Sequence, residues 1–129
     1  MAVGLSTVNT VNAWLNCIRA SGTTRTVVAG TQVQLHTGDP GAAGTSNVSV
    51  GSASKVALTQ AAASGGAIAL NGTPPSWTNG GTSETITHIS VWDTSTFLYS
   101  IALTASQAWS SGNTFTLNTC GVSMSPLAA

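Results

Sequence analysis

Charged side chains are scarce in this 129-residue chain. Together they make 5% of the sequence and leave no formal net charge, whereas a typical globular chain carries roughly a quarter charged residues. So few lysines and arginines form no basic stripe that would neutralise several phosphates, and we expect no direct contact with nucleic acid. The basic residues are Arg19, Arg25 and Lys55, and the acidic residues are Asp39, Glu84 and Asp93.

Long apolar runs and paired cysteines are also missing. Residues 1–20 have no basic start and are interrupted by asparagines, so we expect no signal peptide, and no segment is long enough to cross a membrane. Cys17 and Cys120 lie far apart in sequence, and sequence alone does not decide whether they are bridged. Synthesis in a cytoplasm, which we expect, favours two buried free thiols.

The scarcity of acids and histidines leaves little material for catalysis. His36 and Asp39 are three residues apart, but two candidate ligands do not define a metal site. We interpret His36 as an outward strand residue and Asp39 as the cap of the turn at Pro40-Gly41. His88 and Asp93 have opposite parity on one strand, so they point to opposite faces. We therefore predict no catalytic residue, no metal and no cofactor, and no enzyme.

Composition does predict a folded chain. With 42% hydrophobic residues, residues 1–129 have enough apolar surface for one domain with a core. Ser6 and Thr7 are suited to cap a helix. The apolar residues after them recur at helical spacing, which predicts an amphipathic helix over residues 7–19, ended by Ser21-Gly22. These apolar residues are Val8, Val11, Trp14 or Leu15, and Ile18.

The rest of the chain has the patterns of β-strands. Residues 32–36 alternate, with Val33 and Leu35 on one face and Gln34 and His36 on the other. Residues 85–92 and 97–103 form a hairpin around a turn at 93–96, with Phe97, Tyr99, Ile101 and Leu103 on a single face. Further strands are expected at 55–59, 67–70 and 114–119, with one long loop at 37–47 and a second long loop that begins with residues 72–77.

These short strands, separated by Gly, Ser and Asn turns, predict the fold class. It is mainly β, a single jelly-roll-like β-sandwich over about residues 26–125 with one N-terminal helix packed on it. Exposed aromatic side chains in loops stack on sugars, so Trp77 and Trp109 are candidate glycan contacts. The default for a tryptophan in so small a β domain is core or interface.

Several runs of the sequence also resemble those of a known protein family. The run Leu35-His36-Thr37-Gly38-Asp39-Pro40-Gly41, within residues 33–47, resembles a family of small tail-fibre-like or virion structural proteins of phages that infect actinobacteria. Residues 72–77, 84–93 and 97–100 continue the resemblance. It implies a non-enzymatic component on the surface of a phage particle, with no catalytic residues to carry over.

Two functions within the structural class follow as expectations. The first is a capsid decoration, or minor capsid, protein that stabilises the head from outside. It is favoured because the module stands without a stalk, and its partners are the major capsid protein and copies of itself, as a trimer. The alternative is a minor tail or tail-fibre-like protein at the tail tip, with weak binding of host glycans. In both, the candidate assembly contacts are Val8, Val11, Trp14, His36, Asp39 and Pro40.

Overall fold

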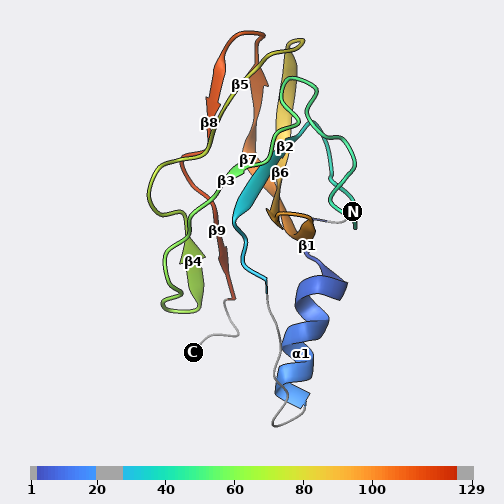
Figure 1. Ribbon diagram of the computed structural model, residues 1–129, viewed down its shortest axis with the longest axis vertical. Coiled ribbons are helices and arrows are strands. Elements are labelled where there is room, and N and C mark those ends of the chain that lie inside the picture. The colour runs from blue at the N-terminus through green and yellow to red at the C-terminus, as the bar shows by residue number, and fades with distance from the viewer. Residues whose placement is uncertain (1–2, 20–27, 125–129) are drawn as a thin grey trace.

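The computed structural model describes residues 3–19 and 28–124. It confirms a mainly β chain with one N-terminal helix and antiparallel sheets (Figure 1). The helical elements are the π-helical turn η1 (Thr7–Val11) and the α-helix α1 (Asn12–Arg19). The strands are β1 (Gly4–Leu5), β2 (Gln32–His36), β3 (Val56–Ala57), β4 (Ala67–Ala69), β5 (Ser76–Thr78), β6 (Glu84–Asp93), β7 (Thr96–Trp109), β8 (Thr114–Thr116) and β9 (Gly121–Ser123).

A five-stranded antiparallel sheet forms the centre, in the order β1-β7-β6-β2-β3. The longest strand pair of this sheet is the predicted hairpin of β6 and β7, which is closed by the turn where Asp93 lies opposite Thr96. β2 pairs along β6, so that Val33 lies opposite Val91 and Leu35 opposite Ile89. These β-branched and aliphatic pairs on one face of the pleat begin the hydrophobic core.

Two small ribbons, β4–β9 and β5–β8, complete the fold. The core forms where aromatic side chains of the β5–β8 ribbon meet the large sheet. Phe115 contacts both Trp77 and Trp109 edge to face, with ring centroids 6.0 and 6.2 Å apart. The buried core cluster is Val33, Leu35, Leu58, Trp77, Ile86, Ile89, Val91, Leu98, Tyr99, Trp109, Phe115, Leu117 and Cys120.

The second face of β2 is buried as well, which corrects the expected outward position of His36. Gln34 and His36 are both buried, and the imidazole of His36 is 0% exposed. The loop after β2 returns over this face. Val48 forms an antiparallel β-bridge with His36, and the backbone N–H of Ser49 donates to the carbonyl of Leu35 at 3.0 Å. Alternation predicted the two faces of β2 correctly, but it did not show that a loop covers the polar one.

A β-bulge corrects the predicted face of Phe97. Val91 pairs with Tyr99, but the next residue of β6, Trp92, pairs with Phe97, so Leu98 is the extra residue of β7. Phe97 therefore leaves the face of Tyr99 and packs on Trp92, with ring centroids 5.4 Å apart. Strand parity alone does not predict this change, because one inserted residue inverts every side chain beyond it.

The N-terminal helix is present over the predicted residues 7–19, but its first turn is π-helical. The Ser6 side chain accepts a hydrogen bond from the backbone N–H of Asn9, which is the expected capping role. The predicted stop at Ser21-Gly22 lies outside the described residues. No residue of α1 is buried, and Figure 1 shows the helix extending away from the strands.

β7 runs on to Trp109 instead of ending at residue 103, and β8 ends at Thr116 instead of residue 119. Two short strands differ more. The strand expected at 55–59 is reduced to Val56–Ala57, and residues 76–78, expected within a loop, form β5. The register of β5 with β8, in which Trp77 lies opposite Phe115, explains the second difference. A short segment beside two prolines becomes a strand because a distant aromatic partner stabilises the pair.

Candidate functional site

The loop at residues 37–47 carries the most specific sequence signal, and its hydrogen bonds make it a closed structure. The carboxylate of Asp39 accepts from the backbone N–H of Gly41 at 2.9 Å, which is the predicted turn cap. Asn47 closes the loop, because its Nδ2 donates to the carbonyl of Asp39 at 2.8 Å. Pro40 is buried inside it. The motif therefore builds a rigid support for the sheet.

His36 belongs to a buried chain of hydrogen bonds. Its Nδ1 donates to the carbonyl of Ser46 at 2.8 Å, so its Nε2 accepts from the hydroxyl of Ser90 at 2.6 Å. The Ser90 oxygen in turn accepts from Nε1 of Trp92 at 2.7 Å. Each donor has an acceptor when the imidazole is neutral. His36 thus joins the loop to the sheet and, being buried, presents no surface to a partner in this conformation.

Burial controls the protonation of His36. Desolvation lowers the pKa of its imidazole below 6.5, and the nearby His88 lowers it further, while the hydrogen bond to the Ser46 carbonyl opposes the shift. A neutral imidazole with both nitrogens bonded inside the protein is poorly placed for acid–base catalysis or for binding a metal. Among residues 3–19 and 28–124, no three His, Cys, Asp or Glu side chains gather as a metal site requires.

Glu84, the acid placed at the start of β6, also has a structural role. Its carboxylate accepts a short hydrogen bond from the hydroxyl of Ser49 and further bonds from the backbone N–H groups of Val50 and Gly51, at 3.1 and 3.0 Å. Three donors fix this carboxylate to the loop after β2. The arrangement anchors a turn of the chain and resembles no pair of catalytic carboxylates.

The tryptophans singled out for glycan contact lie in the core. Trp77 and Trp109 are each 3% exposed, and both donate through Nε1, Trp77 to the carbonyl of Ser54 and Trp109 to that of Asn113, at 3.0 and 2.9 Å. Their ring faces pack around Phe115. Both rings therefore lie in the core, which is one of the default positions of a tryptophan in a small β domain. Stacking of a sugar on either ring has no support in this geometry.

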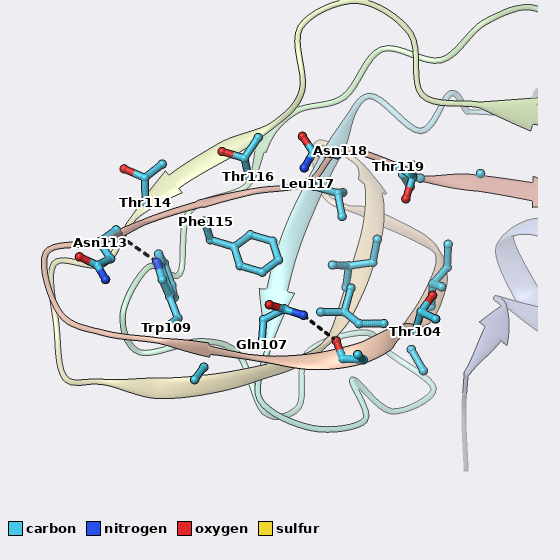
Figure 2. Close-up of a pocket in the computed structure, with 18 residues that line it drawn as sticks. Thr104, Gln107, Trp109, Asn113, Thr114, Phe115, Thr116, Leu117, Asn118 and Thr119 are labelled. Atoms are coloured by element: carbon cyan, nitrogen blue, oxygen red, sulfur yellow. Dashed lines mark hydrogen bonds between the residues drawn. The ribbon is translucent and has the colours of Figure 1, made fainter.

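An open groove of about 690 Å³ lies between β7 and the chain that runs through β8 towards β9. Figure 2 shows Phe115 and Leu117 pointing into it from one wall and Gln107 from the other. Its other lining residues include exposed threonines and an asparagine, and no charged side chain. These polar residues are Thr104, Thr114, Thr116, Thr119 and Asn118. Local sequence patterns do not predict the groove, because its walls come from β7 and from residues 113–121, which only the tertiary structure brings together.

The helix residues proposed as assembly contacts differ in exposure. Val8 is exposed, whereas Val11 and Trp14 are half-buried. Trp14 lines an apolar cavity of about 230 Å³ between the helix and the strands, with Leu98 and Tyr99 on its other side. The helix is therefore attached along one side and open along the other. None of the described helices is long and apolar enough to span a membrane.

Both cysteines are free thiols, as expected, but only Cys120 is buried, whereas Cys17 is exposed on the helix. Burial raises the pKa of the Cys120 thiol, and its neighbour Tyr99 has a pKa raised to about 12, chiefly by burial and then by Cys120. Gln60 donates to the Tyr99 hydroxyl at 3.1 Å. Both acidic protons therefore stay in place at neutral pH.

Together the sheet, its fastened loop and the exposed helix define a β-rich structural protein. Residues 4–125 match the family described as "Podophage GP4 fiber I protein gp80". The chain belongs to this family of phage fibre proteins, which are structural and not enzymatic. No curated protein matches the chain.

The family corrects the order of the two expected functions. The chain is a virion component, as the resemblance implied, but a tail-fibre protein rather than a capsid decoration protein. The alternative reading is thus better supported than the first. The lack of a stalk favoured the head, but an isolated sequence carries no information about the neighbours of the module in a particle.

Proposed function

We propose that this chain is a building block of the tail fibre of a phage that infects actinobacteria, and that it works there as a trimer bound to other virion proteins. The family match over residues 4–125 carries the tail-fibre part of the proposal, and the resemblance of residues 35–41 supports the choice of host. The nearly uncharged surface supports it, because copies meet without like-charge repulsion. The fastened loop at 37–47 supports a module that keeps its shape under load.

Labelled particles test the position of the protein. An antibody raised against the purified chain is bound to native particles, which are then imaged by electron microscopy. Label confined to the tail end supports the proposal. Label spread over the head would place the protein on the capsid and overturn it.

The groove supports a second function, the binding of a neutral host glycan. An uncharged groove whose exposed lining includes Gln107, Thr114 and Asn118 suits the hydroxyls of a neutral sugar (Figure 2). Cell-wall polysaccharide from the host is the probe. Gln107→Ala is expected to weaken its binding, while Asn71→Ala, at an exposed position outside the groove, leaves it unchanged. Equal binding by the two variants would remove the glycan function.

A further inference from the structure

An apolar stripe on the N-terminal helix is exposed to solvent. Val8, Leu15 and Ile18 are 78, 57 and 83% exposed, and half-buried Val11 lies between them in sequence. Single apolar residues on a surface are common, but four along one helix are a feature of contact surfaces. These four residues are called the helix stripe below.

The spacing of the helix stripe is that of helices that pack on one another. Its members follow at intervals of three, four and three residues, which are the a and d positions of a heptad. Val8 and Leu15 take the a positions, and Val11 and Ile18 the d positions. The π-helical turn η1 holds more residues per turn, so it moves Val8 towards one side of the line formed by the other three.

The side of the helix away from the stripe is attached to the sheet. Asn9 donates through Nδ2 to the carbonyl of Phe97 at 2.8 Å, and the hydroxyl of Thr10 donates to the carbonyl of Leu98 at 3.1 Å. Thr10 is buried, and both bonds end on β7, so this side of η1 faces the sheet. The attachment therefore orients the helix stripe outward, where α1 projects beyond the strands (Figure 1).

Within the part of the chain that the structure describes, α1 itself has no buried residue. The helix has eight residues. Isolated helices shorter than about 12–15 residues are marginal in water, and most helical stability in proteins comes from packing of an apolar face. A second surface that covers the apolar face in the assembled protein would explain why so short a helix is stable.

We propose that the helix stripe is covered by the same stripe of two further copies of this chain, in a short parallel three-helix coiled coil. Leucine at a with isoleucine at d, as in Leu15 and Ile18, shifts the preference from two helices to three or four, and the trimer of the proposed function selects three. Charge favours a copy as the occupant. Arg19 is the one charged residue of residues 7–19, and its Nε already donates to Asn16. The inference adds a surface to the trimer of the proposed function and rests on it.

The mass of the full chain in solution tests this contact. We expect sedimentation equilibrium to give three chains for the native protein and one chain for Leu15→Glu, a threefold loss of mass. Cys17→Glu introduces the same charge at an exposed position c, facing away from the stripe, and is expected to stay trimeric. Far-ultraviolet circular dichroism checks that the sheets of each variant remain folded.

A cross-link tests the geometry without weakening the contact. In a Cys17→Ser background, Leu15→Cys places a thiol in an a layer, and mild oxidation is expected to join chains in pairs. The native Cys17, in position c, is the matched control and is expected to leave the chains unlinked.

Each outcome decides the inference. A native chain that is monomeric or dimeric at all concentrations, or a Leu15→Glu variant that stays trimeric, would overturn it. So would equal cross-linking at positions 15 and 17. A monomeric chain that imaging still places at the tail end would leave the fibre assignment intact, so the two failures are distinguishable.

Discussion

His36 illustrates how one residue connects sequence motif and core. It belongs to the run that carries the family resemblance, and it links the Ser46 carbonyl to Ser90 and Trp92 through a buried chain of hydrogen bonds. The alternating pattern predicted its strand and its face, but not its burial. The loop that covers it is placed by contacts such as Ser49 with Glu84, 35 residues apart in sequence.

Because the imidazole of His36 is buried, we expect the free energy of unfolding to fall in acid. The pKa of His36 is lowered in the folded protein, so the unfolded chain binds a proton that the folded chain resists. The contribution of the neutral ring is complete above pH 6.5 and is lost as pH falls from 6.5 towards the folded pKa. The limiting slope is about 1.4 kcal/mol per pH unit. Urea unfolding followed by tryptophan fluorescence between pH 5 and 8 measures it.

Variants of the two facing histidines separate this effect from general acid sensitivity. His36→Asn is expected to reduce the slope and, by leaving buried partners unsatisfied, to lower the free energy of unfolding at pH 8 by about 1–3 kcal/mol. His88→Asn keeps the buried imidazole of His36 and is expected to keep a slope. A native protein whose stability does not change between pH 6.5 and 5 contradicts the prediction.

At the scale of elements, the loop at 37–47 depends on a glycine that contacts an aromatic ring. Gly44 has φ +73°, and a Cβ at this position would overlap the ring of Phe97. The backbone thus enters a conformation that suits glycine, and the absent side chain makes room for the ring. The bulge at Leu98, which turns Phe97 to this face, and Gly44 are two parts of one contact.

Gly44→Ala is therefore expected to destabilise the protein more than an ordinary substitution at positive φ. Gly72→Ala is the matched control, because Gly72 has φ +76° and no atom lies within 4 Å of its added Cβ. The control is expected to lose about 1–2 kcal/mol from backbone strain, and Gly44→Ala about 1–3 kcal/mol more from overpacking. Urea titration of both variants measures the difference. Equal losses would show that Phe97 moves away without cost.

At the scale of the whole molecule, the scarcity of charge determines how copies interact. The chain carries three basic and three acidic residues, and Lys55 lies over the ring of Trp92, with Nζ 3.6 Å from its centroid. Glu84 is engaged within the chain. Few charged groups remain to form ion pairs across an interface. Apolar burial, worth about 25 cal/mol per Å², is then the main source of association energy.

Association is consequently expected to depend weakly on salt. Between 0.05 and 1 M salt the Debye length shortens from above about 10 Å to about 3 Å, which weakens exposed ion pairs but leaves apolar contacts in place. Sedimentation of the purified chain across this range measures the dissociation constant, with particle integrity as a second readout. A dissociation constant that rises steeply with salt would mean that charged groups hold the copies together.

The amino-acid sequence alone determined the local elements and the chemistry of the surface. The helical spacing of residues 8–18, the alternation in β2 and the β6–β7 hairpin are written in neighbouring residues, and the scarcity of charge is a matter of composition. Only the tertiary structure decided which faces are covered. The burial of His36, the core positions of Trp77 and Trp109 and the groove between β7 and β8 depend on contacts between distant segments. Periodicity reports which side chains share a face, but burial requires a second surface whose position no local pattern contains.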